Sequence, residues 1–227
     1  MPSAIVMMAK TPRPGTVKTR LCPPLSPEEA ADLYRCFLLD TIAKLSTCRQ
    51  ASLFIAYTPR TDRGVFAALA PHLPLLPQRG RDLGARMADC FAQLFARGYT
   101  DVLLTGSDLP TLPLYMIHQA LDLMAKPPID VVLGPSEDGG YYLIGLHALH
   151  RELFADMTWS TPQVLAETVR RAQAQELQIA YLPPWFDVDT PADLARLQAM
   201  LTQDSNALLP HTQRFFRQCP SARATLS

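Results

Sequence analysis

The sequence predicts an α/β protein whose mostly parallel sheet is covered by helices on both faces. Short apolar segments bounded by turn residues recur along the chain, as is typical of strands buried on both faces. Segments with helical periodicity lie between most of them, and this alternation indicates strand–helix–strand units. A single hydrophobic core can support a chain of 227 residues, so we expect one domain over 1–202 and a peripheral tail over 203–227.

The expected strands cover 5–9, 52–57, 101–105, 130–134, 141–146 and 178–182. The clearest helices are expected over 26–45, 82–97, 113–124, 161–175 and 190–201, with a short one near 214–217. Ser26, followed by Pro27 and Glu29, predicts an N-cap with a capping box. Thr161 and Thr190 also precede proline, and we expect the same device there.

The turn sequence Glu137-Asp138-Gly139-Gly140 joins two apolar segments and predicts a hairpin. A hairpin here departs from the parallel order, so the expected sheet is mixed.

Composition narrows the functional classes. Lys plus Arg equals Asp plus Glu at 21 each, so the chain has no net positive charge that would attract nucleic acid. A small ligand is therefore expected. The five cysteines lack any C-x-x-C pair, which favours a reducing cytoplasm over a disulfide framework or a zinc site. No apolar run reaches the roughly 18 residues of a membrane span, and the apolar start over 4–9 is expected to be a strand, not a signal peptide.

The richest segment follows the first strand and runs from Lys10 to Arg20 as KTPRPGTVKTR. Ligands of α/β sheets collect at the carboxyl ends of strands, where this loop is expected. Gly15 permits close approach of the backbone to a ligand, Lys18 supplies a point charge, and Arg20 can donate two hydrogen bonds to phosphate oxygens. The loop therefore suits a polyphosphate. It is not a P-loop, and the plainer alternative is a solvated, proline-stiffened surface loop.

Two later segments carry candidate metal ligands. Asp108 follows an apolar strand, and a carboxylate there can hold Mg²⁺ or Mn²⁺; the alternative is a turn or helix cap. Asp187 and Asp189 lie on the same side of an extended segment. Asp189 is the candidate second ligand, whereas Asp187 either ties down the loop or supports the metal shell. Helix capping explains Asp193.

Two further segments remain open between function and local structure. The segment 78–87 places Asp82 and Gly84 at a helix start, which suits contact with a base or phosphate, or ordinary capping by Asp82. The segment 137–142 is either part of a site or a simple hairpin turn. The five histidines show no metal-ligand spacing, and Ser107 lacks a G-x-S-x-G context, so neither indicates chemistry.

Taken in order, these segments resemble the nucleotide-diphospho-sugar transferase superfamily with the GT-A fold. Within it the chain is most similar to bacterial guanylyltransferase-like (CofC-like) glycosyltransferases, some of them linked with arsenosugar biosynthesis. The resemblance runs from Ile5 to about Leu201. Its motifs are KxPxPGxVKTRL over 10–21, DLGxRM over 82–87, GSDLP over 106–110, EDGGYYLxGL over 137–146, WST over 159–161 and DVDTPxDL over 187–194.

The resemblance implies a Rossmann-like three-layer α/β/α sandwich of GT-A type and a set of site residues. The implied metal ligands are Asp108 and Asp189, for Mg²⁺ or Mn²⁺. The implied catalytic residues are Lys18, Asp108 and Asp138. The implied nucleotide-binding residues are Ala9, Lys10, Pro14, Gly15, Lys18, Thr19, Arg20, Asp82, Gly84 and Ser107. The implied acceptor-binding residues are Asp138, Gly139, Gly140 and Tyr141.

The leading interpretation is a metal-dependent glycosyltransferase that takes a nucleotide-diphosphate-sugar donor and a small-molecule acceptor, with Asp138 as the candidate base. The alternative is a nucleotidyltransferase of guanylyl or cytidylyl type, which joins an NTP to a phosphorylated small molecule and releases pyrophosphate. The single acid in Ser107-Asp108-Leu109, in place of a D-x-D pair, is closer to this second pattern. A nucleotide-binding regulator without turnover is a third possibility.

Overall fold

The computed structural model describes residues 2–203 and 209–219; the rest of the predicted tail, 204–208 and 220–227, lies outside the described residues. Its strands are β1 (Ser3–Lys10), β2 (Ala51–Thr58), β3 (Leu75–Pro77), β4 (Asp101–Thr105), β5 (Val131–Pro135), β6 (Tyr141–Leu146) and β7 (Ile179–Tyr181). Its α-helices are α1 (Pro27–Leu45), α2 (Arg63–Leu69), α3 (Leu83–Phe95), α4 (Leu114–Met124), α5 (Val164–Ala174), α6 (Pro191–Gln203) and α7 (Pro210–Gln218). Short 3₁₀ helices are η1 (Thr19–Leu21), η2 (Arg60–Asp62) and η3 (Arg151–Leu153).

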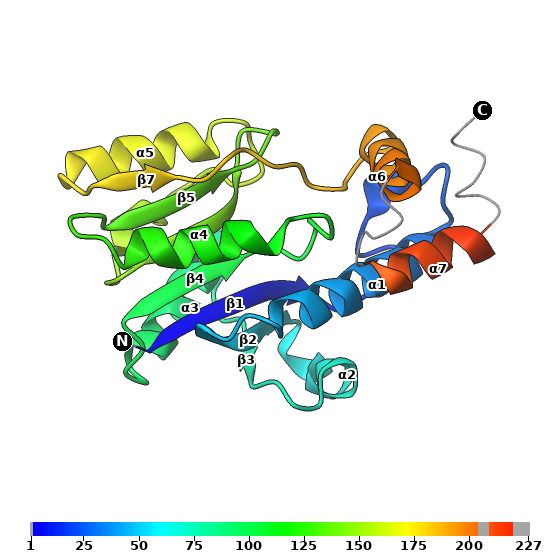
Figure 1. Cartoon of the computed structure of the whole chain (residues 1–227), viewed down its shortest axis with the longest axis horizontal. Coiled ribbons are helices and arrows are strands. Elements are labelled where there is room, and N and C mark those ends of the chain that lie inside the picture. The colour runs from blue at the N-terminus through cyan, green and yellow to red at the C-terminus, as the bar shows by residue number, and fades with distance from the viewer. Residues whose placement is uncertain (1, 204–208, 220–227) are drawn as a thin grey trace.

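The strands form one seven-stranded sheet in the order β3-β2-β1-β4-β6-β5-β7 (Figure 1). Only β6 runs antiparallel to its neighbours, and β5 and β6 form the hairpin expected from the turn at 137–140. The other paired strands are parallel. The predicted mixed, mostly parallel α/β sheet is therefore confirmed.

Helices cover both faces of this sheet because alternate residues of the strands bury into opposite clusters. In β1, Ile5 and Met7 join a cluster with α1 and α4, whereas Ala4 and Val6 join a second cluster with α3. All four are fully buried. Period-two alternation of a wholly apolar strand thus produces the three-layer α/β/α sandwich.

The helix starts follow the predicted capping chemistry in two of three cases. Ser26 Oγ accepts a hydrogen bond from Glu29 N, and Ser26 N donates to the Glu29 carboxylate, which completes the capping box of α1. Thr190 Oγ1 accepts from Asp193 N at the start of α6. The prediction for Thr161 was wrong: α5 begins later, after Gln163, and the Thr161 hydroxyl donates to the Thr158 carbonyl instead.

The helix expected near 214–217 is α7, and it lies along α1 (Figure 1). The buried carboxylate of Asp40 in α1 accepts hydrogen bonds from His211 N, Thr212 N and the Thr212 hydroxyl. It thus gives partners to backbone N–H groups in the first turn of α7, which have none within the helix. Leu209 and Cys219, on either side of α7, are buried in the core. The domain boundary near 202 stays a prediction.

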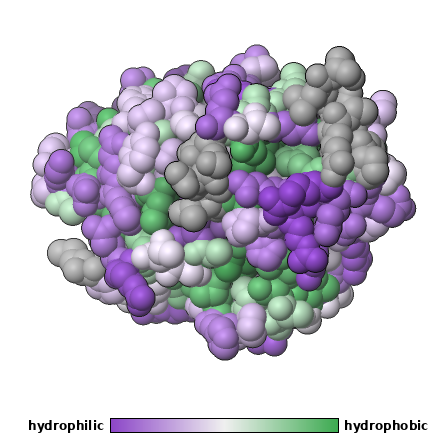
Figure 2. Space-filling model, turned by 45° about the vertical axis from the view of Figure 1, so that its right-hand side comes forward, coloured by the Kyte–Doolittle hydropathy of each residue, from purple (hydrophilic) through white to green (hydrophobic). Residues whose placement is uncertain are grey.

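The surface is mostly polar. Figure 2 shows hydrophilic residues over most of one face, with smaller hydrophobic patches between them. Within 2–203 and 209–219, the exposed large hydrophobic side chains belong to four different elements; they are Val65, Leu83, Tyr115 and Tyr181. None of the described helices combines the length and apolar character that a membrane crossing requires.

Candidate functional site

A cavity of about 550 Å³ opens at the carboxyl ends of β1 and β4, where the chain order of the sheet turns back on itself. This is the edge at which α/β sheets collect ligands. Most of the predicted site residues line the cavity: Ala9, Lys10, Lys18, Thr19, Arg20, Ser107, Asp108, Asp138, Gly140, Tyr141 and Asp189. The loop after β1, the end of β4, the β5–β6 turn and the segment before α6 therefore meet in one site.

The loop from Lys10 to Arg20 is anchored to the core. Val17 and Leu21 are buried beneath it, and the Arg13 guanidinium lies 2.7 Å from Asp62. Gly15 (φ 71°) and Lys18 (φ 51°) both have left-handed backbone conformations, which glycine adopts readily and lysine rarely. The loop thus forms one wall of the cavity and is held in place by contacts with the core, so it is more than a solvated surface loop.

Lys18 is the cation at the centre of the site. Its ammonium contacts Oδ1 of Asp108 and lies 2.7 Å from Oδ1 of Asp189, and the side chain is only 3% exposed. Arg20 lies 2.9 Å from the other oxygen of Asp189. Burial by itself disfavours the Lys18 ammonium, but the two carboxylates outweigh burial and raise the pKa of Lys18. Burial likewise opposes ionisation of Asp189, yet Lys18 and Arg20 hold its pKa below the usual value.

Tyr34 of α1 links the two strand ends that carry this ion-pair cluster. Its hydroxyl accepts from the backbone N–H of Lys10 at 3.1 Å and shares a 2.8 Å hydrogen bond with Ser107 Oγ. Tyr34 and Ser107 are both buried. Tyr34 carries no functional signal in the sequence, because an aromatic residue on the apolar face of a helix indicates only core packing.

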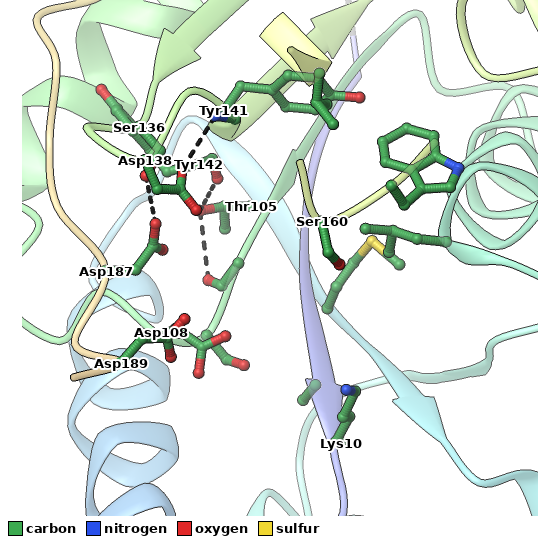
Figure 3. Close-up of a pocket in the computed structure, with 18 of the residues that line it drawn as sticks. Lys10, Thr105, Asp108, Ser136, Asp138, Tyr141, Tyr142, Ser160, Asp187 and Asp189 are labelled. Carbon is green, nitrogen blue, oxygen red and sulfur yellow. Dashed lines mark hydrogen bonds between the residues drawn. The ribbon is translucent and has the colours of Figure 1, made fainter. Parts of the chain in front are cut away.

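Asp187 supports the loop that carries Asp189. Its carboxylate accepts a hydrogen bond from Ser136 Oγ at the end of β5 (Figure 3). Burial, together with repulsion from Asp108 and its other acidic neighbours, raises the pKa of Asp187 to about 7. Of the two roles expected for Asp187, the structure thus shows the tie to the loop. Asp193 caps α6 as expected, since its carboxylate accepts from the backbone N–H groups of Asp189 and Thr190.

The aspartates gather on one side of the cavity, and Lys10 and Ser160 lie across it (Figure 3). Asp138 Oδ1 accepts from Gly140 N at 3.0 Å, so this carboxylate stabilises its own turn. Gly139 (φ 89°) is required there because a Cβ would lie 2.3 Å from the carbonyl oxygen of Pro162. Gly139 itself does not line the cavity.

Four of the predicted nucleotide-binding residues also lie outside the cavity lining: Pro14, Gly15, Asp82 and Gly84. Asp82 accepts from Ala85 N at 2.8 Å and is the N-cap of α3. A Cβ at Gly84 would lie 2.5 Å from both the Phe154 carbonyl oxygen and the Trp159 ring. Close packing of α3 therefore accounts for this glycine.

Gln78 also lines the cavity, although within the segment 78–87 only Asp82 and Gly84 were expected as binding residues. Its amide nitrogen donates to the carbonyls of Ala9, at 3.2 Å, and Ala56, at 2.8 Å, which fixes the orientation of the carboxamide. The signal was weak because Gln78 follows β3, a three-residue strand containing proline.

The donor set suits a hard divalent cation. Asp108 and Asp189 converge on one ammonium ion, so two carboxylates already share a position for positive charge. Among the residues that the structure describes, no group of three or more His, Cys, Asp or Glu could hold a metal ion. If Mg²⁺ or Mn²⁺ bound at this position, Asp108 and Asp189 would supply two carboxylates, and water and phosphate oxygens would complete the shell.

Comparison with known proteins places this geometry in a family context. The chain is 27% identical over 186 residues to 2-phospho-L-lactate guanylyltransferase of Methanothermobacter thermautotrophicus. The aligned region covers 79% of this chain and 78% of that protein. A crystal structure of a candidate nucleotide-diphospho-sugar transferase from Desulfovibrio desulfuricans is 35% identical, with a TM-score of 0.86 over 96% of this chain and 98% of that one.

A manganese complex of the protein Rv0371c from Mycobacterium tuberculosis has the same fold at 15% identity, with a TM-score of 0.54 over 87% of this chain and 97% of that one. The similarities to the Desulfovibrio structure and to the guanylyltransferase confirm the nucleotide-diphospho-sugar transferase superfamily, its Rossmann-like fold and a nucleotide-dependent transferase as the class of enzyme. A family model described as "Uncharacterized protein conserved in bacteria (DUF2064)" matches residues 41–161, more than half of the chain, which therefore belongs to that family.

Proposed function

We propose that this enzyme is a nucleotidyltransferase that joins an NTP to a phosphorylated small molecule and releases pyrophosphate. The observation that carries the proposal is the convergence of Lys18, Arg20, Asp108 and Asp189 at one cavity edge. The similarity to a guanylyltransferase supports it. This reverses the order of the two sequence-based interpretations, in which glycosyl transfer came first.

Charge explains how such a site binds a triphosphate. Arg20, paired with Asp189, and Lys10, across the cavity from the aspartates, supply cationic donors for phosphate oxygens. Asp108 and Asp189 would hold Mg²⁺ or Mn²⁺, which neutralises charge on the phosphates when bound. The manganese complex of a protein with the same fold supports the use of such an ion.

The proposed step is an in-line substitution at phosphorus. An oxygen of the acceptor phosphate forms a bond to the α-phosphorus of the NTP as the bond from that phosphorus to the bridging α–β oxygen breaks. Pyrophosphate leaves with the bonding electron pair. An ionised phosphate needs no base to become nucleophilic, so positioning and charge neutralisation supply most of the catalysis.

Glycosyl transfer to a hydroxyl needs a base in its inverting form. Asp138 is the candidate base, and its carboxylate accepts a hydrogen bond from Gly140 N through one of its two oxygens. One observation favours this second function: the 35% identical structure is described as a candidate nucleotide-diphospho-sugar transferase. It remains the alternative, with Asp138 as the base.

We also propose a cytoplasmic location, because the five cysteines include no C-x-x-C pair of the kind that redox or zinc sites use.

Product analysis distinguishes the two reactions. The enzyme is incubated with each of the four NTPs and a panel of phosphorylated small molecules, or with nucleotide sugars and hydroxyl acceptors, in the presence of Mg²⁺ or Mn²⁺. Pyrophosphate release with one NTP supports nucleotidyl transfer. Release of a nucleoside diphosphate from a nucleotide sugar, without pyrophosphate from any NTP, would overturn the proposal in favour of glycosyl transfer.

A further inference from the structure

The Lys18 ammonium occupies the position that the proposed function gives to a divalent cation. It bridges Oδ1 of Asp108 and Oδ1 of Asp189, while Arg20 contacts the second oxygen of Asp189. Two positive side chains thus balance two negative ones. The pair of carboxylates has no net negative charge left with which to attract a free metal ion.

The packing around Lys18 shows that this arrangement is built into the fold. The side chain is 3% exposed, and the ammonium lies 5.8 Å from the ring centre of Tyr34 and 5.9 Å from that of Phe37. Both rings belong to α1, so the ammonium has aromatic faces around it as well as carboxylates. In this conformation Lys18 contributes to the protein's own ion pairs and presents little surface to a phosphate.

We propose that Lys18 holds the cation position until a nucleotide arrives, so that the divalent ion and the nucleotide polyphosphate bind together and the ion binds poorly alone. The inference rests on the proposed function. The physical reason is repulsion: a metal ion entering beside an ammonium meets a like charge in a partly buried site. A polyphosphate supplies anionic oxygens for both cations, so it lets Lys18 leave Asp108 and Asp189 while the metal takes its place.

Binding of the two ligands is then coupled. If the nucleotide raises the affinity for the metal, the metal raises the affinity for the nucleotide by the same factor, as thermodynamic linkage requires. Removing the Lys18 charge removes the competitor, so it should raise the affinity for the metal alone. A lysine that served only to bind phosphate would give no such gain.

The test is a Mn²⁺ titration followed by water-proton relaxation, which responds when Mn²⁺ joins a macromolecule. The titration is performed without nucleotide and again with a mixture of the four α,β-methylene ribonucleoside triphosphates. We expect the wild type to bind Mn²⁺ about tenfold or more tightly with the analogues than without them. We expect Lys18→Met to bind Mn²⁺ alone about tenfold more tightly than the wild type, because the repulsion is gone.

Lys10→Met is the matched control, because Lys10 lines the same cavity but has no ion pair with either aspartate among the described residues. Its affinity for Mn²⁺ alone should stay close to that of the wild type. If Lys18→Met fails to fold, as judged by circular dichroism, Lys18→Gln replaces it, and the wild-type titrations decide by themselves if neither variant folds.

Wild-type protein that binds Mn²⁺ equally well with and without the analogues would overturn the inference, and so would a Lys18 variant that gains nothing over the wild type. Both results leave the proposed function intact. Wild-type protein with no Mn²⁺ response under any condition would overturn the metal-dependent function itself, and the inference with it.

Discussion

Replacing Tyr34 by phenylalanine removes one oxygen atom from the junction of the two strand ends. The hydroxyl accepts from Lys10 N and shares a hydrogen bond with Oγ of Ser107, a residue that is 2% exposed. The ring itself stays, so the aromatic packing of α1 is preserved. The variant therefore tests whether this hydroxyl holds the loop after β1 and the Asp108 segment in one arrangement.

The expected loss follows from the groups left behind. A buried polar group without a partner costs about 1–3 kcal/mol, and Ser107 Oγ loses the hydrogen bond that Tyr34 provides. We expect Tyr34→Phe to lower the free energy of unfolding by about 2 kcal/mol. For a chain of this length that corresponds to a decrease in Tm of roughly 4–8 °C.

The assay is thermal unfolding followed by circular dichroism, combined with a double-mutant cycle. Ser107→Ala removes the other end of the hydrogen bond, so the double variant should cost less than the sum of the single variants by about 1 kcal/mol. Tyr115→Phe, at a tyrosine that is 59% exposed, is the control and should leave Tm unchanged. A Tyr34→Phe variant as stable as the wild type, or strictly additive costs, would refute the reasoning.

Three further predictions concern other parts of the structure. Gly139→Ala should lose about 2 kcal/mol or more in urea unfolding, because its Cβ would collide with Pro162; Gly98→Ala, which also has positive φ (88°) but open space around it, should lose less. Burial lowers the pKa of Lys44 to about 8, so between pH 8 and 10.5 the unfolded chain binds more protons than the folded one, and the free energy of unfolding should rise with pH. Lys44→Met should remove this rise, which amounts to at most about 3 kcal/mol, and denaturant titrations at several pH values measure it. Asp108→Asn should fold normally by circular dichroism but lose turnover by about a hundredfold or more, and retention of full activity would contradict its assignment.

Most of the fold could be predicted because its elements are long or strongly patterned. The apolar segments at 101–105 and 141–146 coincide with β4 and β6, and α1 begins after the predicted cap. The edge strand β3 and the helix α2 were missed. They have three and seven residues, too few for a periodic pattern to stand out.

The site could be predicted only in part, for a similar physical reason. Asp108 and Asp189 are polar residues placed where strands or extended segments end, and this local signal marks them in the sequence. The partners of Lys18 and Tyr34 depend on how distant segments meet: Lys18 and Asp189 are 171 positions apart, and Tyr34 and Ser107 are 73 apart. Sequence reasoning therefore named Lys18 as a phosphate ligand but did not foresee its ion pairs with both aspartates.

Binding of a nucleotide together with a divalent ion is the central claim, and a thermal-shift panel tests it most directly. The four NTPs and the common nucleotide sugars are compared with and without Mg²⁺ or Mn²⁺, for the wild type and Asp108→Asn. A ligand at 100 times its Kd stabilises the folded state by about 2.7 kcal/mol, or roughly 5–10 °C for a chain of this size. We predict such a shift for at least one NTP with metal in the wild type and its loss in Asp108→Asn. A wild-type protein that no nucleotide stabilises, with either metal, would contradict the account.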